Sequence, residues 1–246
     1  MKHSVALAAL MALAVAGCSK KAADNGGGVT APSAPVAAVS PPAGKQWTDI
    51  VVATPQGGYL MGNPDAPVKL VEYASFTCPH CQLFSKTGTE PLKAKYVSTG
   101  RVSWEFRPFL IHGQDAPITM LMNCRGAEPF FTLTEQLYAN QEAIVQRYVA
   151  APPAELQRIA ALPSADNFKA QAEIGGLYGF FGARGLPRAQ ADACLSNQKA
   201  IDQLTAWQSK YQEDGVNMTP TFFINGEPQT GGEWEQLEPL LAQAVG

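Results

Sequence analysis

Two cysteines separated by two residues stand where a strand pattern meets a helix pattern, and no other feature constrains the fold as strongly. The apolar run Val68–Ala74 predicts a buried strand, and residues 82–96 predict a helix. A Cys-Pro-His-Cys segment at residues 78–81 joins them. The first turn of a helix offers unpaired N–H groups and the positive end of the helix dipole. We therefore expect a stabilised thiolate and a lowered pKa at Cys78.

The N-terminal residues have the pattern of a bacterial export signal. A short basic region precedes an apolar stretch, residues 4–15, that is too short to span a bilayer as a permanent helix. Val-Ala-Gly-Cys at residues 15–18 resembles a lipobox, in which Cys18 becomes the lipidated first residue. The alternative is an ordinary signal peptide cut near Ala16. We expect residues 1–17 to be a lipoprotein signal peptide.

The composition changes between this signal and the first strand pattern. Residues 18–46 are rich in Ala, Gly, Ser and Pro, which cannot bury a core, so a flexible tether is expected behind the lipidated cysteine. A folded domain should occupy residues 47–246. The net charge of −3 gives no general basic patch, so the sequence does not predict nucleic-acid binding.

The domain is expected to contain two halves built from strands and helices. Strand 68–74, the helix after it and the alternating residues 102–107 predict a βαβ unit. Near the other end, residues 219–224, an Asn-Gly hairpin turn and residues 227–230 predict two antiparallel strands. Residues 233–244 predict a closing helix. The second half is therefore a ββα unit.

Helical patterns without a convincing strand fill the segment between these halves, at about residues 114–210. Its apolar side chains Phe130, Phe131, Leu133 and Leu137 are expected to be structural core. The fold class predicted from the sequence is α/β, with a mixed central sheet and an inserted all-helical subdomain.

The motif, the insertion and a Thr219-Pro220 pair before a strand together resemble the thioredoxin fold and, within it, the DsbA family of bacterial envelope thiol-disulfide oxidoreductases. The resemblance covers residues 68–246. It implies that Cys78 is the exposed nucleophile and that Cys81 is its buried partner. A substrate thiolate would attack the disulfide at Cys78 to give a mixed disulfide, and no cofactor is implied.

The same resemblance assigns roles to the neighbours of the two cysteines. The imidazole of His80 can donate a hydrogen bond to the Cys78 sulfur, and Pro79 stands early in the helix, where its missing N–H costs nothing. Pro220 corresponds to the cis-proline of the family, and the backbone of Thr219 would pair with a bound peptide. Many DsbA oxidases carry Val before this proline, whereas Thr resembles isomerase and DsbG-like relatives.

Glu72 lies six residues before the first active-site cysteine, in the predicted strand, where the family has a buried acid. In an apolar setting its carboxyl group would have a raised pKa and could relay the proton of Cys81. The alternative is an exposed acid at a strand edge.

Two further cysteines, Cys124 and Cys194, fall in predicted helices of the insertion. Four thiols allow three pairings, and assigning the motif cysteines to each other leaves Cys124 with Cys194 as a structural disulfide. A redox relay to the motif is the rival role. A zinc site that uses both motif cysteines and His112 is conceivable, but the spacing matches no familiar finger, and no metal is predicted.

The predicted function is donation of the Cys78–Cys81 disulfide to cysteines of extended or unfolded exported proteins. A disulfide isomerase or reductase of the same fold is the first alternative, and a metal-binding or chaperone-like binding module is the second. The expected partners are cysteine-containing envelope substrates, a membrane redox partner and a lipid anchor, with the protein a monomer. The expected location is the periplasmic side of the bacterial envelope.

Overall fold

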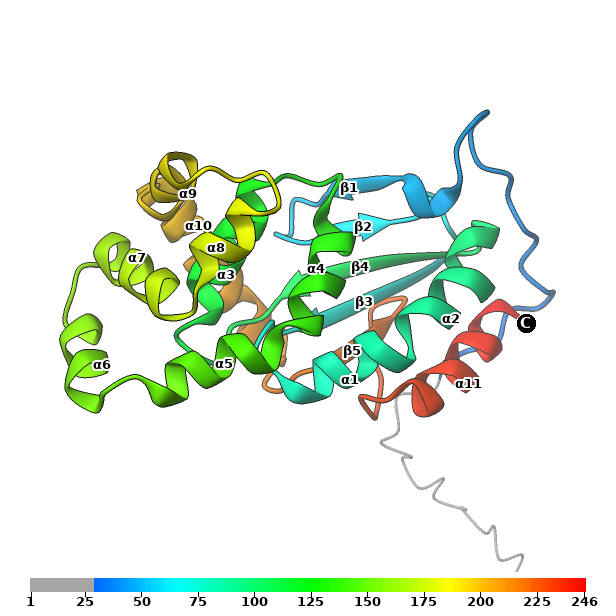
Figure 1. Ribbon diagram of the computed structural model, residues 1–246. Helices are drawn as coiled ribbons and strands as arrows, with labels where there is room; N and C mark the ends of the chain where they lie inside the picture. Colours follow the sequence, from blue (N-terminus) through cyan, green and yellow to red (C-terminus); the bar gives the residue numbers. More distant parts are fainter. Residues whose placement is uncertain (1–28) are drawn as a thin grey trace, which may run out of the picture.

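A six-stranded sheet with the strand order β1-β2-β4-β3-β5-β6 forms the centre of the protein (Figure 1). The computed structural model describes residues 29–246. The strands are β1 (Val51–Ala53), β2 (Tyr59–Met61), β3 (Val68–Ala74), β4 (Val102–Pro108), β5 (Thr221–Ile224) and β6 (Glu227–Pro228). Strands β3 and β4 are parallel, and the other neighbours are antiparallel. The predicted mixed sheet is confirmed.

Helices lie beside the sheet and extend from one end of it (Figure 1). Those next to the sheet halves are α1 (Pro79–Thr87), α2 (Thr89–Lys95) and α11 (Trp234–Val245), with short 3-10 helices at Trp47–Asp49 and Val97–Thr99. The insertion contains α3 (Asp115–Cys124), α4 (Phe130–Ala139), α5 (Gln141–Ala150), α6 (Pro153–Ala160), α7 (Ser164–Ile174), α8 (Leu177–Gly182), α9 (Arg188–Leu195) and α10 (Gln198–Glu213). The predicted helical insertion between two strand-containing halves is therefore present.

The cysteine motif follows the C-terminal end of β3, which is a central strand of the sheet. Glu72 on this strand pairs with Phe106 of β4 on one side and with Phe222 of β5 on the other. Because β5 runs antiparallel to β3, the beginning of β5 lies beside the end of β3, with Tyr73 opposite Thr221. The register therefore brings the segment before β5 next to the start of α1.

Some element boundaries differ from the sequence expectations. The helix expected over residues 82–96 begins earlier, at Pro79, and divides at Gly88 into α1 and α2. A Cβ atom on Gly88 would lie 2.7 Å from the ring of Phe84, so this position requires glycine for close packing. Strand β2 was not predicted, because its three residues directly follow a Gly-Gly turn signal and are too few to show a period.

Residues 29–46 lie against the folded domain, although the composition predicted a flexible tether there. The Val36 N–H donates to the Val245 carbonyl at 2.8 Å, and the Val39 N–H donates to the Thr99 carbonyl at 2.9 Å. The indole N–H of Trp47 donates to the Val39 carbonyl at 2.7 Å. An extended, proline-rich backbone leaves its polar groups free to form such bonds. Residues 1–28, including Cys18, lie outside the described part of the chain.

The insertion shares one hydrophobic core with the sheet. The four apolar residues singled out in the sequence are all at most 4% exposed, as predicted: Phe130, Phe131, Leu133 and Leu137. The Phe130 ring stacks on Tyr59 of β2 with centroids 3.9 Å apart and also contacts the ring of Phe106 of β4. Helix α4 is therefore packed onto the sheet. No helix within residues 29–246 is long and apolar enough to cross a membrane.

Candidate active site

The two cysteines of the motif occupy unequal positions at the start of α1. Cys78 is the N-cap residue, with an extended backbone, and Pro79 is the first residue of the helix, early in it as the family resemblance implied. Both cysteines are free thiols in the structure. Only 4% of the Cys78 surface is exposed, and Cys81, one turn into the helix, is completely buried. A reacting sulfur can therefore approach only the first cysteine of the pair.

The surroundings of Cys78 stabilise its thiolate. A hydrogen bond from the Cys81 thiol is the largest influence and lowers the pKa of Cys78 to about 5, against the opposing effect of burial. The side chain of Thr219 and the backbone N–H groups of Cys81 and His80 also lower this pKa. At neutral pH the reduced pair is thus a thiolate at Cys78 beside a thiol at Cys81.

The pKa of Cys81 is shifted in the opposite direction. Burial raises it well above its ordinary value, and the hydrogen bond to Cys78 and the negative charges of Cys78 and Glu72 raise it further. A buried anion without a cationic partner is costly, so Cys81 keeps its proton until Cys78 has reacted. The two sulfurs therefore have separate chemical roles.

His80 contributes through its backbone more directly than through its ring. Its backbone N–H is among the groups that stabilise the Cys78 thiolate. The resemblance implied a hydrogen bond from the His80 imidazole to the Cys78 sulfur. Within residues 29–246 the structure shows no such bond. The side chain is exposed and lines the groove beside the active site.

The peptide bond between Thr219 and Pro220 is cis and faces the cysteine pair. The Cys78 sulfur lies 3.3 Å from the Thr219 carbonyl oxygen, to which the protonated thiol donates. This contact favours the thiol, whereas the bond from the Thr219 side chain favours the thiolate. The pKa of Cys78 is nevertheless lowered, because the Cys81 thiol, the Thr219 side chain and the helix N–H groups together stabilise the thiolate.

An open groove with a volume of about 580 Å³ begins at this proline. The groove-lining side chains come from the active-site helix, the segment before β5 and the segment after β6: His80, Asn217, Met218, Pro220, Gln229 and Glu233. Met218 stands 65% exposed at its rim. An extended peptide could lie here with its backbone against Thr219 and a cysteine over Cys78.

Glu72 is buried beneath the cysteines, so the alternative of an exposed strand-edge acid is wrong. Its side chain is on the central strand and is 1% exposed. Its Oε2 atom accepts a hydrogen bond from the Trp104 indole N–H at 3.0 Å. Burial raises the pKa of Glu72 to about 8, although the Trp104 bond opposes the shift. The group can therefore gain or lose a proton near neutral pH.

Asp115 is a functional candidate that the sequence analysis missed. It is fully buried at the first position of α3, and its carboxyl group accepts hydrogen bonds from the Ser75 and Thr77 hydroxyls. The backbone N–H groups of Thr77, Ile111 and His112 also donate to it. Burial raises the pKa of Asp115, and these hydrogen bonds oppose that shift. The carboxyl group thereby holds the loop before Cys78 against the insertion.

The candidate zinc ligand His112 belongs to the same polar network. Its Nδ1 atom lies 2.8 Å from the Thr77 hydroxyl oxygen, which places the ring beside the loop that leads into the motif. In the part of the chain that the structure describes, no group of three or more His, Cys, Asp or Glu side chains is placed to hold a metal ion. The conceivable site of His112 with both motif cysteines is thus not assembled.

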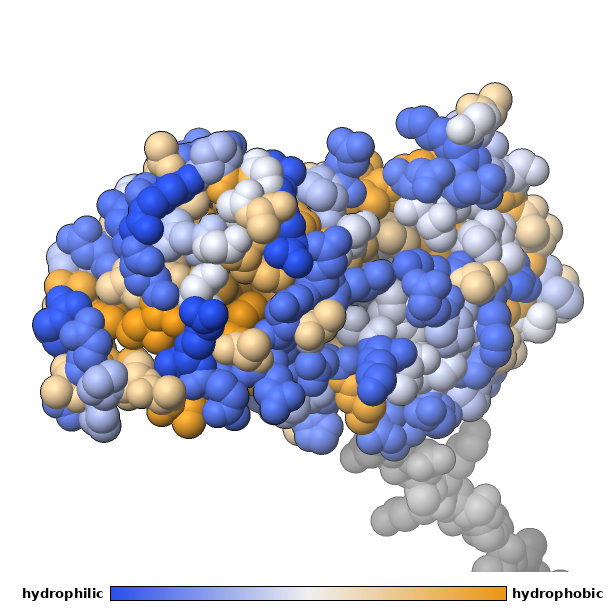
Figure 2. Space-filling model, in the orientation of Figure 1, coloured by the Kyte–Doolittle hydropathy of each residue, from blue (hydrophilic) through white to orange (hydrophobic). Residues whose placement is uncertain are grey.

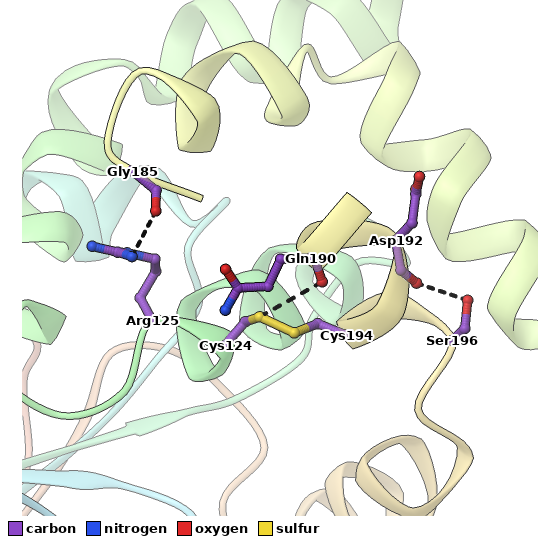
Figure 3. Close-up of a disulfide and its surroundings, with 7 residues drawn as sticks. All are labelled: Cys124, Arg125, Gly185, Gln190, Asp192, Cys194 and Ser196. Carbon is purple, nitrogen blue, oxygen red and sulfur yellow. Dashed lines mark hydrogen bonds between the residues drawn. A yellow bond between two sulfur atoms is a disulfide. The ribbon is translucent and has the colours of Figure 1, made fainter. Parts of the chain in front are cut away.

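Cys124 and Cys194 form a disulfide that joins α3 to α9 (Figure 3). Their Cα atoms are 6.1 Å apart, and 70 positions separate them in the chain. Beside it, the Arg125 guanidinium donates to the Gly185 carbonyl at 2.8 Å and ties the end of α3 to the turn before α9 (Figure 3). The pairing is the one that the cysteine count predicted, and both residues lie in the insertion.

Comparisons with known proteins agree with this geometry. The family described as thioredoxin matches residues 54–242. A protein of Rickettsia prowazekii whose name describes a protein-disulfide oxidoreductase is 33% identical over 171 residues, which is 68% of this chain and 54% of that protein. A Rickettsia bellii protein with the same kind of name is 25% identical over 76% of this chain and 64% of its own length. The chain thus spans between half and two thirds of these relatives.

Solved structures show the same likeness. The crystal structure of a protein-disulfide isomerase from Novosphingobium aromaticivorans is 32% identical, with a TM-score of 0.72, and covers 76% of this chain and 96% of that one. Wolbachia pipientis alpha-DsbA1 is 23% identical, with a TM-score of 0.58 over 79% of this chain and 93% of its own, and supports the fold alone.

Proposed function

Because this chain belongs to the thioredoxin family, in its DsbA-like branch, we propose that it carries out thiol-disulfide exchange with cysteines of extended or unfolded exported proteins. The observation that carries the proposal is the opposed shift of two neighbouring thiols. The pKa of Cys78 is lowered to about 5, while that of Cys81 is raised well above its ordinary value. Two cysteines that serve only as a structural disulfide, or only as buried side chains, would not need opposite pKa shifts.

The proposed reaction starts from the Cys78–Cys81 disulfide. A substrate thiolate attacks the Cys78 sulfur, the bond between the two cysteines breaks, and Cys81 leaves with the electron pair and takes up a proton. A second substrate thiolate then attacks the substrate sulfur of the mixed disulfide, and Cys78 leaves as a thiolate. The substrate gains a disulfide, and the Cys78–Cys81 pair is reduced.

The proposed direction is oxidation of the substrate. A thiol of low pKa is a good leaving group, and stabilising its thiolate stabilises the reduced pair, which makes the disulfide more oxidising. The pKa of about 5 at Cys78 supports this direction. In the second step the leaving sulfur is Cys78 itself, so release of the oxidised substrate should be fast.

Disulfide isomerisation is the second candidate, and two observations favour it. Thr219 stands before the cis proline, and the structure with 32% identity is named a protein-disulfide isomerase. An isomerase works from the reduced pair, in which the Cys78 thiolate attacks a wrong disulfide of the substrate. The two candidates therefore differ in the redox state in which the cell maintains the Cys78–Cys81 pair, and both form a mixed disulfide at Cys78.

The proposed setting is the periplasmic side of a bacterial envelope, with a lipid on Cys18 and a membrane redox partner that restores the Cys78–Cys81 pair. The export pattern of residues 1–17 and the lipobox-like residues 15–18 support this setting. Mass spectrometry of the mature N-terminus tests the lipid, and an unmodified end would contradict it.

The activity itself is tested with a reduced peptide that carries two cysteines. The oxidised wild-type protein should convert it to the disulfide form. A Cys81→Ala variant whose Cys78 is first joined to glutathione in a disulfide should exchange the glutathione for a one-cysteine peptide and hold that peptide as a mixed disulfide. A chaperone-like holder would keep its function in Cys78→Ala, and a metal-binding module would retain near-stoichiometric metal in the reduced protein. Absence of peptide oxidation and of any mixed disulfide would overturn the proposed function.

A further inference from the structure

A small internal cavity lies between the buried Glu72 and the surface. Its volume is about 10 Å³, roughly the space that one water molecule occupies. The residues around it that carry hydroxyl or carboxyl groups come from β3, α1, α2 and α4, and they are Glu72, Ser85, Thr89, Thr134, Glu135 and Tyr138. A cavity of this size with several hydroxyl and carboxyl groups suits an ordered water.

The cavity adjoins an open groove with a volume of about 760 Å³. Four residues line both spaces: Ser85, Thr89, Glu135 and Tyr138. The remaining groove-lining residues include Pro79 and Leu83 of α1 and Glu142 of α5. A continuous series of polar groups thus leads from the buried carboxyl group, past one water-sized space, to solvent.

This groove is separate from the groove that would hold the substrate. The substrate groove is lined by His80, Thr219 and Pro220, and it has no lining residue in common with the groove of Glu135. A peptide held as a mixed disulfide on Cys78 covers the first groove. The second groove lies along the α1 residues Gln82, Ser85 and Lys86 and remains open to water at that stage.

We propose that protons pass between Glu72 and solvent through the small cavity, with Glu135 of α4 as the proton-exchanging residue at its outer end. The inference rests on the proposed thiol-disulfide exchange and adds the route by which its proton travels. It assigns a role in catalysis to a residue of the helical insertion.

The proton and electron balance of the proposed step is simple. When a substrate thiolate opens the disulfide, the Cys81 sulfur leaves with the electron pair and takes the proton of the Glu72 carboxyl group. The Glu135 carboxylate takes a proton from solvent and passes it to the cavity water, and the cavity water gives a proton to the resulting Glu72 carboxylate. The reverse sequence releases a proton when the pair is reoxidised.

The other groups around Glu72 cannot carry its proton to solvent, because their hydrogen bonds are made to other partners or to Glu72 itself. The Trp104 N–H donates to Glu72 itself, and the Tyr138 hydroxyl donates to the Ser75 carbonyl at 3.1 Å. Cys81, on α1, is the group that exchanges its proton with Glu72. Burial raises the pKa of Glu72 to about 8, so its carboxyl group exchanges protons in the range where the reaction runs.

Glu135 is suited to the outer position by its partial exposure and its anchoring. Its side chain is 39% exposed, and its Oε1 atom lies 3.0 Å from the ammonium group of Lys93 on α2. Lys93 also pairs with Glu90 at the groove mouth. The carboxyl group is thereby held at the boundary between the cavity and the solvent.

The test is the rate at which a two-cysteine peptide reduces the oxidised protein, measured by stopped flow from pH 5 to 9 in ordinary and heavy water. Glu135→Gln keeps the shape of the residue and should lower this rate by about tenfold and enlarge the solvent isotope effect. Glu135→Asp should restore much of the rate. The reduction potential of the pair should stay unchanged, because the end states are the same.

Glu142→Gln is the matched control, because Glu142 lines the same groove without reaching the cavity. It should behave as the wild-type protein. Equal rates and isotope effects in Glu135→Gln and Glu142→Gln would overturn the route, and so would a rate change in Glu135→Gln that a shifted reduction potential accounts for. Failure of the wild-type protein to react at all would instead overturn the proposed function, together with the inference that rests on it.

Discussion

The protein contains two cysteine pairs that the fold treats in opposite ways. Cys78 and Cys81 stand on the first turn of α1 as free thiols, one with a lowered and one with a raised pKa. Cys124 and Cys194 are 70 positions apart and form a disulfide between two helices of the insertion. Reactivity therefore follows from helix N–H groups and unequal burial, and the cysteine side chain alone does not determine it.

The two cysteine pairs also differ in the side chains that surround them. Around the motif the structure places ionisable and hydrogen-bonding groups, namely Glu72, Asp115 and Thr219, within the loops and strands that meet at α1. The disulfide of the insertion joins α3 to α9. Figure 2 shows a patch of hydrophobic surface on this helical part of the molecule. The surroundings of Cys78 and Cys81 suit thiol-disulfide exchange, whereas the Cys124–Cys194 disulfide links two helices of the insertion.

The strongest test of this contrast removes the nucleophile. Cys78→Ala should abolish peptide oxidation, by about a thousandfold or more, because the variant cannot form the Cys78–Cys81 disulfide that a substrate thiolate attacks. The oxidation rate of a two-cysteine peptide measures it. The Cys124→Ala/Cys194→Ala double variant is the control and should keep the rate. If it lost activity while Cys78→Ala retained activity, the assignment of the two pairs would be reversed.

Removing the other pair should affect stability instead. In the chain-entropy model a loop of 70 residues gives roughly 4 kcal/mol of stabilisation, so the Cys124→Ala/Cys194→Ala variant should lose about that free energy of unfolding. Urea denaturation of both proteins, with the Cys78–Cys81 pair oxidised, measures the difference. An unchanged unfolding free energy would show that this disulfide does not hold the insertion together.

Glu72→Gln should sharpen the contrast through the dependence of stability on pH. The pKa of Glu72 is raised from 4.5 to about 8, so between these pH values the folded protein holds a proton that the unfolded chain has lost. The stability from this group is fully present below pH 4.5 and is lost as the pH rises through 8. The variant should lack this loss and be more stable than the wild type at pH 8.5 by up to about 5 kcal/mol.

Unfolding of the oxidised protein at a series of pH values measures this effect without interference from the active-site thiols. Glu142→Gln, at an exposed position, is the control and should follow the wild-type curve. Parallel curves for wild type and Glu72→Gln would mean that the carboxyl group ionises normally and has no special part in proton transfer.

The smallest effect concerns Thr219. The side-chain hydrogen bond of this residue lowers the pKa of Cys78, so Thr219→Val should raise that pKa by about one unit or less. Thiolate absorbance near 240 nm, followed against pH, measures the change. Thr221→Val is the control, because the Thr221 hydroxyl donates to the Met218 carbonyl and has no such bond to the cysteine. A pKa that did not move would leave the helix N–H groups and Cys81 as its determinants.

The sequence predicted those elements whose local pattern and tertiary environment agree. Strand β3 was predicted with its observed boundaries because it is a central strand, between β4 and β5, and five of its seven residues are buried. The Asn225-Gly226 turn was evident because both residues adopt positive φ there, a conformation that these residue types favour. The cysteine motif followed from the strand-to-helix junction.

The features that the sequence did not predict depend on contacts between segments that are far apart in the chain. Asp115 gave no signal beyond an acid at a helix start, because its donors come from two loops, including one nearly 40 positions earlier. Residues 29–46 have a composition typical of tethers, and several of their hydrogen-bond partners, including Thr99 and Val245, come from distant parts of the folded chain. The position of Glu135 beside the Glu72 cavity likewise requires α4 to pack against α1.

The reduction potential of the Cys78–Cys81 pair, measured by equilibration with glutathione buffers and with Cys78→Ser as the blank, tests the account most directly. The pKa of Cys78 is about 5, two units below the value of about 7 in thioredoxin, and each tenfold change in the equilibrium corresponds to about 30 mV. The account predicts a potential about 60 mV or more above that of thioredoxin, which is about −270 mV. A value at or below that of thioredoxin would contradict disulfide donation and favour a reductase.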